Sequence, residues 1–107
     1  MSDIILNNNA NIWQSNYNSA LQRGLEAIGL VAEGYAKEDT PVDTGRLRNS
    51  ITHTKDDKAA YIGTNVEYAP YVENGTRDRK GVYMLRKAAT EHSEEYRKLM
   101  KESLENA

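Results

Sequence analysis

The sequence predicts an α+β domain, in which a long N-terminal helix and a C-terminal helix pack on a small antiparallel sheet and a short helix follows the central hairpin. Apolar residues recur at helical spacing near the start and again near the end of the chain. Between these two segments, β-branched residues recur at every second position, as in a strand, and a charged turn follows them. At 107 residues the chain has the length of one domain, so we expect residues 1–107 to fold as a single unit.

The first helix is expected over residues 11–38, where apolar residues follow one another mostly in steps of three and four. These residues are Trp13, Tyr17, Ala20, Leu21, Leu25, Ile28, Val31, Ala32 and Tyr35. Gly24, Gly29 and Gly34 lie inside the segment, and each disfavours a helix interior by about 1 kcal/mol relative to alanine. We therefore expect a bend or a break near one of them.

Residues 1–10 precede this helix as a candidate N-terminal arm. Ile4, Ile5 and Leu6 form a short apolar run that three asparagines end. Two interpretations stay open for this run, an edge strand of this domain or an arm that lies on a neighbouring protein.

A sharp turn is expected after the first helix. Pro41 ends the helix, because proline disfavours the α region for the residue before it. Asp43 and Thr44 are capping residues, and Gly45 accepts backbone angles that other residues resist. One helical turn over residues 45–50 should follow.

The central hairpin is expected to consist of two strands over residues 51–54 and 59–64. Ile, Thr, His and Thr alternate in the first strand, which favours β structure. The four residues of segment 55–58 are all charged and form the turn. Such a hairpin needs further strands or a helix to be stable in water.

A short helix is expected over residues 67–73, because proline suits a first turn and Asn-Gly follows as a stop. Tyr68, Tyr71 and Val72 should share one side of it. The basic loop 76–81 comes next, and a final helix over residues 83–105 carries Leu85, Ala88, Ala89, His92, Tyr96, Leu99, Met100 and Leu104 at helical steps, with Glu94 and Lys98 set as an ion pair.

Composition excludes several kinds of site. The chain has no cysteine, so disulfides and thiolate metal sites are ruled out, and we expect neither cofactor nor metal. Sixteen acidic residues against fourteen basic ones give a formal charge of −2, which offers no overall attraction to nucleic acid or to an anionic membrane. The N-terminus lacks the pattern of a secretory signal and the longest apolar stretch falls far short of the ~20 residues that span a bilayer. We expect a soluble, non-exported protein.

Some residues of the chain are types that carry catalytic chemistry or bind nucleic acid. Asp43, Ser50 and His53 are the residue types of a hydrolase triad, but no nucleophile-elbow pattern accompanies them. Glu67 and Glu73 flank one short helix and should point in different directions. The alternatives left open are a small hydrolase or nuclease that uses Asp43 and His53, and a DNA-contacting module that uses Arg77, Arg79 and Lys80.

Two motifs together resemble a known family. They are Pro-Val-Asp-Thr-Gly-Arg-Leu-Arg-Asn-Ser-Ile at 41–51 and Ile-Gly-Thr-Asn-Val-Glu-Tyr-Ala-Pro-Tyr-Val-Glu-Asn-Gly-Thr at 62–76. This chain is similar to the small head-tail joining and tail-completion proteins of long-tailed bacteriophages and prophages, also known as minor tail components. Family members often open the final helix with Pro-Phe-Leu-Arg-Pro-Ala, where this chain has no proline over residues 83–88.

The resemblance implies a structural virion protein without catalytic residues or cofactors. It implies a homo-oligomeric ring in the neck, around the DNA channel between capsid connector and tail tube, with six copies or alternatively twelve. The partners would be further copies, neighbouring neck, connector and tail-terminator or tail-tube proteins, and DNA that passes without sequence-specific binding. The candidate motif and interface residues are Asp43, Thr44, Gly45, Arg46, Leu47, Arg48, Ser50, Tyr68, Ala69, Tyr71, Glu73, Gly75, Thr76, Arg77, Arg79 and Lys80. Loop 76–81 and the arm should become ordered only on assembly.

Overall fold

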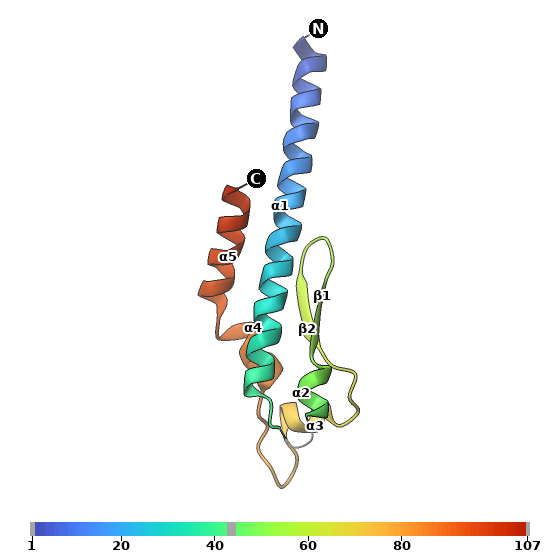
Figure 1. Ribbon diagram of the computed structural model, residues 1–107, viewed down its shortest axis with the longest axis vertical. Helices are drawn as coiled ribbons and strands as arrows, with labels where there is room; N and C mark the ends of the chain where they lie inside the picture. The colour runs from blue at the N-terminus through green and yellow to red at the C-terminus, as the bar shows by residue number, and fades with distance from the viewer. Residues whose placement is uncertain (1, 43–44, 107) are drawn as a thin grey trace.

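A long helix organises the whole molecule, and the other elements lie beside its lower part or at its lower end (Figure 1). A computed structural model describes the backbone of residues 2–42 and 45–106, and the side chains of residues 13–42 and 45–106. The elements are α1 (Ser2–Asp39), α2 (Arg46–Ser50), β1 (Thr52–Lys55), β2 (Ala60–Gly63), α3 (Ala69–Asn74), α4 (Met84–Thr90) and α5 (Ser93–Glu105). This arrangement confirms the α+β class.

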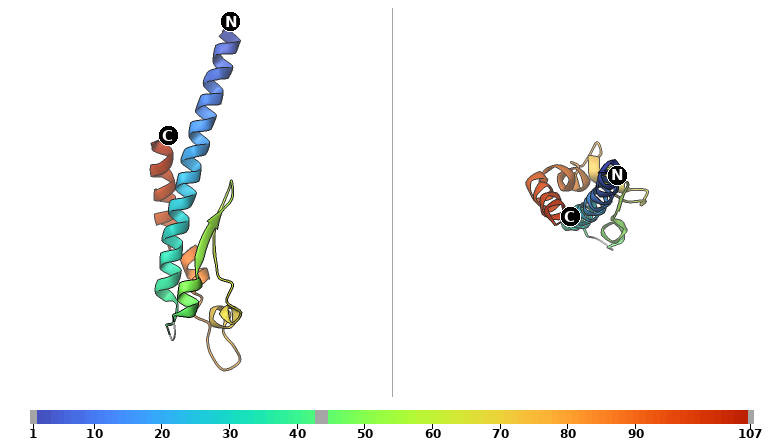
Figure 2. Two further views of the ribbon diagram at one scale, coloured as in Figure 1. Left: turned by 45° about the vertical axis from the view of Figure 1, so that its right-hand side comes forward. Right: turned by 90° about the horizontal axis from the view of Figure 1, so that it is seen from above.

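The molecule is elongated, with principal extents of 71 × 24 × 22 Å. The β1–β2 hairpin lies along one side of α1 and the α4–α5 pair along another (Figure 2). The chain reverses between α1 and α5, so α5 runs antiparallel to α1 and ends well short of its N-terminus (Figure 1). None of the helices in the described part of the chain combines the length and the hydrophobicity that crossing a membrane requires.

Helix α1 differs from the prediction at its start and in its interior. It begins at Ser2, so the segment expected as an edge strand or an arm is helical, and it continues through all three glycines. A Cβ on Gly24 would come within 2.6 Å of the Met100 sulfur, and one on Gly29 within 2.8 Å of the His53 ring. The expected break is absent, and at two of the three positions the missing side chain lets α5 and β1 pack close to α1.

The hairpin agrees with the prediction. Strands β1 and β2 pair antiparallel, with His53 opposite Ile62 and Thr54 opposite Tyr61. The Oδ1 atom of Asp56 accepts hydrogen bonds of 2.8 Å from two backbone amides of the turn, and the Tyr61 hydroxyl donates to the other carboxylate oxygen at 2.7 Å. These bonds lower the pKa of Asp56, the amide of Lys58 contributing most.

Two small hydrophobic clusters form the core. The upper cluster joins α1, the residue between α2 and β1, and α4 through Ala36, Ile51 and Ala88, with Tyr35, Ile62 and Leu85 at its edge. The lower cluster consists of Leu47, Val66, Ala69 and Met84, with Tyr68, Val72, Val82 and Leu85 packed against it. Leu85 belongs to both, so α4 links the two halves of the core.

The C-terminal segment forms two helices where one was expected. Helix α4 ends at Thr90 and α5 begins at Ser93, with His92 between them in a non-helical conformation. The His92 ring stacks on Tyr35 of α1 with ring centres 3.5 Å apart, which draws the chain toward α1 at this point. The expected pair of Glu94 and Lys98 is not observed, because Glu94 pairs with Arg97 at 3.1 Å.

Candidate functional site

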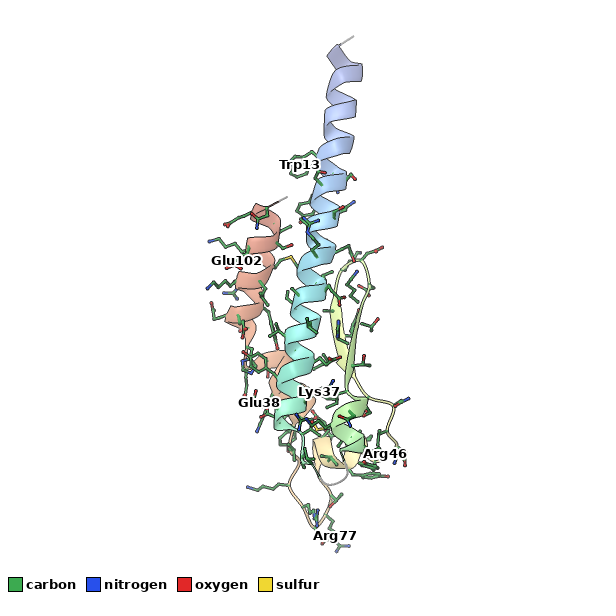
Figure 3. The ribbon with its side chains drawn as sticks, in the orientation of Figure 1. Trp13, Lys37, Glu38, Arg46, Arg77 and Glu102 are labelled. Atoms are coloured by element: carbon green, nitrogen blue, oxygen red, sulfur yellow. The ribbon has the colours of Figure 1, made fainter. Side chains whose placement is uncertain are left out.

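The two sequence motifs meet at the lower end of the molecule, where α2 lies beside the segment that leads into α3 (Figure 3). The Arg46 guanidinium donates to both carboxylate oxygens of Glu67 at 3.0 and 2.9 Å and lies 5.4 Å from the centre of the Tyr68 ring. This pair raises the pKa of Arg46 and lowers that of Glu67. Both side chains are more than half exposed, so screening by solvent leaves the pair little effect on stability.

Ser50 connects the motifs through hydrogen bonds. Its hydroxyl donates to the Leu47 carbonyl at 2.6 Å and lies 2.5 Å from the Thr64 hydroxyl. Since the Ser50 proton is directed at the carbonyl, the Thr64 hydroxyl donates to Ser50, and the same Thr64 oxygen accepts from the amide of Val66 at 3.1 Å. Leu47 itself is buried in the lower core cluster with Ala69. These motif residues therefore hold the fold together.

Glu73 has a structural role that its sequence position did not reveal. Its carboxylate accepts hydrogen bonds from the amides of Leu85 at 2.8 Å and Arg86 at 3.0 Å, which are free donors in the first turn of α4. Tyr83 at the N-cap has a left-handed conformation and no side-chain capping bond of its own. Glu73 from α3 supplies the cap in its place.

The basic loop 76–81 connects two short segments whose backbones are hydrogen-bonded to each other. Backbone bonds join Val82 to Val72 at 2.8 Å and Thr76 to Arg79 at 2.8 Å, and Gly75 has a φ of +87°. A Cβ on Gly75 would come within 2.5 Å of the Gly81 nitrogen. The close approach of the two backbone segments therefore requires glycine at position 75. The side chains of Arg77, Arg79 and Lys80 are exposed, and Arg77 lies at the end of the molecule opposite Trp13 (Figure 3).

The remaining candidates separate into buried and exposed residues. Tyr68 and Val72, expected with Tyr71 on one side of the short helix, both pack on the lower core, whereas Tyr71 is 64% exposed. Gly45 has a φ of +83°, as a turn glycine requires, and Arg48 is exposed on α2. Asp43 and Thr44 lie outside the described residues.

Ser50 and His53, the two triad candidates that the structure describes, bond to other partners and not to each other. The Ser50 proton is directed at a backbone carbonyl, and both ring nitrogens of His53 face carboxylates of α1. The described residues contain no group of three side chains suited to hold a metal ion. Among the described residues, the geometry gives no support to the hydrolase or nuclease alternative.

His53 instead connects the hairpin to α1 through hydrogen bonds. Its Nε2 lies 2.7 Å from Glu26 and its Nδ1 3.2 Å from Glu33. The bond to Glu26, then the bond to Glu33, raise the pKa of His53, against the opposing effect of burial. Burial also opposes ionisation of Glu33, but its bonds to His53 and Lys37 leave its pKa lowered. The sequence signal was present, since two glutamates seven residues apart flank Gly29 on one helix face.

An exposed aromatic pair marks the upper part of α1. Trp13 and Tyr17 were expected on the buried face of this helix, yet they are 66% and 37% exposed. Their rings stack with centres 5.7 Å apart. A groove of about 720 Å³ lies nearby between α1 and α5, lined by the apolar side chains Ile28, Met100 and Leu104 together with Tyr96, Arg97, Lys101 and Glu105.

Comparison with known proteins gives one match. Residues 12–75, more than half of the chain, match the model of the HK97-gp10-like family, described as "Bacteriophage HK97-gp10, putative tail-component". The chain belongs to this family. The match runs from α1 through both motifs to Gly75, and it confirms the resemblance inferred from them. No curated protein and no solved structure matches the chain.

As an HK97-gp10-like protein, the chain is a structural component of a phage tail. The contacts that the motif residues make within the subunit agree with a structural role for both motifs. Leu47 and Ala69 are buried in the core, while Ser50 and Glu73 make hydrogen bonds within the subunit.

Proposed function

We propose that this protein is a tail-completion or head-tail connector component that forms a ring in the phage neck, between the capsid connector and the tail tube. The observation that carries the proposal is the family match over both motifs. The protein would assemble in the host cytoplasm and remain in the virion. It is proposed to act without catalysis, through shape and contacts.

The distribution of exposed groups supports contacts at both ends of the subunit. Basic side chains gather at one end, on loop 76–81 and on α2, and the stacked, exposed pair of Trp13 and Tyr17 lies on the part of α1 that extends toward the other end (Figure 3). Copies that repeat around an axis through a heterologous contact close into a ring. Six copies are proposed, with twelve as the alternative, and each would present one end to the head and the other to the tail.

The exposed cations are proposed to contact neighbouring proteins and the passing DNA. Arg77, Arg79 and Lys80 are exposed around Asp78, on a chain whose formal charge is −2. Three such charges on one subunit bind phosphate weakly and in a salt-dependent way, which suits DNA that must pass through a channel. We also propose that Arg46 and Arg48 contact an adjacent subunit, and that loop 76–81 gains order in the assembled particle.

Removing the gene from the phage tests this function. We expect lysates with DNA-filled heads and separate tails, because the piece that joins them is missing, and electron microscopy would reveal both. Supplying the wild-type protein from a plasmid should restore joined particles. Normal particles without the protein would overturn the proposal.

The motif arginines offer a sharper version of the same test. The double variant Arg46→Glu with Arg48→Glu should keep the fold, because both side chains are exposed, but should fail to restore joined particles. Arg23→Glu changes an exposed arginine on α1, far from the motifs, and serves as the control that should restore them. Full restoration by the double variant would remove these arginines from the contact.

A further inference from the structure

The upper part of α1 has a face that no other element of the described chain covers. Helix α5 runs along α1 only as far as Leu104, which lines a small cavity of about 190 Å³ with Trp13, Asn16 and Tyr17. Above this point α1 continues alone toward Ser2 (Figures 1 and 2). The stacked rings of Trp13 and Tyr17 lie at the boundary between the covered and the uncovered parts.

This uncovered face continues the face that α5 covers. Ala20 is fully buried and its carbonyl accepts a 2.5 Å hydrogen bond from Ser103 of α5, and Gly24 lies against Met100 of the same helix. Trp13, Tyr17, Ala20 and Gly24 succeed one another in steps of four, three and four, the spacing of a helix–helix seam. A second helix on Trp13 and Tyr17 would therefore extend the α1–α5 seam upward.

The composition of this segment favours a second copy of the same chain as its partner. Residues 4–22 contain no charged residue, although 28% of the chain is charged, and their polar side chains are mostly asparagine and glutamine. An identical pair of charged helix faces would place like charges opposite one another, whereas amide side chains both donate and accept hydrogen bonds and so suit their own copies. A single helix alone in water is also marginally stable.

We propose that residues 2–22 of α1 pack against the same segment of a second copy of this chain, with Trp13 and Tyr17 at the centre of the contact. The apolar groove beside Met100 and Leu104 adjoins this contact and enlarges it. Because both copies use the same face of α1, this contact joins copies in pairs and adds to the heterologous contact that closes the proposed ring. The pairing itself does not depend on the proposed function.

The mass of the purified full-length protein tests the contact, measured by native mass spectrometry and sedimentation velocity. The wild type is expected to be oligomeric. The double variant Trp13→Gln with Tyr17→Gln should associate at least about tenfold more weakly, a change of about 1.4 kcal/mol, and shift to the monomer. Leu30→Gln is the matched control: Leu30 is 58% exposed on another side of α1, and its replacement should leave the mass unchanged. Circular dichroism confirms that each variant is folded.

Three results would overturn the inference: a monomeric wild type, a double variant with the wild-type mass, or a Leu30→Gln control that dissociates equally. Association that needs another tail protein belongs to the first case, since the wild type alone is then monomeric. Particle joining is scored separately in the gene-deletion experiment. Joined particles that require the protein, combined with any of these results, would leave the neck role intact and reject only this contact.

Discussion

His53 is the residue whose chemistry most clearly affects folding. Its imidazole lies between Glu26 and Glu33, so the folded state favours the protonated ring and raises the pKa of His53 above its ordinary value of 6.5. A raised folded-state pKa stabilises the protein fully below the unfolded-state value, and this contribution is lost as pH rises through the folded-state pKa.

The free energy of unfolding should therefore fall as pH rises from about 6.5 through the folded-state pKa of His53. Urea titrations over a pH series would measure this slope. Glu26→Gln should reduce it, because the amide keeps a bond to the ring without the negative charge. An unchanged slope in His53→Gln would assign the pH dependence to other groups.

The hydroxyls of Ser50 and Thr64 should be energetically coupled. Ser50→Ala removes the acceptor of the Thr64 hydroxyl, which leaves a half-buried donor unsatisfied and should cost about 1–2 kcal/mol. A double-mutant cycle with Thr64→Ala, measured by urea unfolding, should give a coupling energy of about 0.5–1.5 kcal/mol. Strictly additive effects would contradict the shared bond.

At the scale of elements, Glu73 of α3 fixes the start of α4. Glu73→Ala should cost about 1 kcal/mol and accelerate hydrogen exchange at the amides of Leu85 and Arg86, which lose their acceptor. Glu73→Gln keeps one acceptor oxygen and should have a smaller effect on exchange. Unaltered exchange at both amides in Glu73→Ala would exclude the capping role.

Two glycines of α1, Gly34 and Gly29, should respond to alanine in opposite ways. Gly34 has no neighbour within 4 Å, so Gly34→Ala should stabilise the protein by about 0.5–1 kcal/mol through helix propensity. Gly29→Ala would place a Cβ 2.8 Å from the His53 ring, which two carboxylates hold in position, and should destabilise the protein. Thermal unfolding distinguishes the two, and stabilisation by both would contradict the observed packing.

The hairpin and the short helices were predictable because their signals are local. The alternating β-branched residues, the charged turn, and the turn formed by Pro41 and Gly45 each depend on only a few neighbouring residues. The errors came from tertiary contacts: Gly24 and Gly29 looked like helix breakers, but they make room for other elements. The separation of α4 from α5 reflects stacking of His92 on Tyr35, a contact between residues far apart in the chain.

In the candidate site too, the local patterns could be predicted from the sequence and the tertiary contacts could not. The two motifs identified the family from the sequence, but the sequence could not pair Arg46 with Glu67 or direct Glu73 to the amides of α4. It also placed Trp13 and Tyr17 on a buried face, because helical spacing indicates which residues share a face and not whether that face is covered.

At the scale of the whole molecule, a core at the lower end supports a long helix whose upper part extends beyond it (Figure 1). The proposed ring would use this shape, with the basic loop at one end and the α1 contact at the other. Both surfaces would then be completed by assembly.

Cryo-electron microscopy of the intact neck tests this account most directly. The account predicts a closed ring of copies of this chain around the DNA channel, in which the upper segments of α1 contact one another and the basic loops lie at the opposite end. A neck without this chain, or with isolated copies that do not enclose the channel, would contradict it.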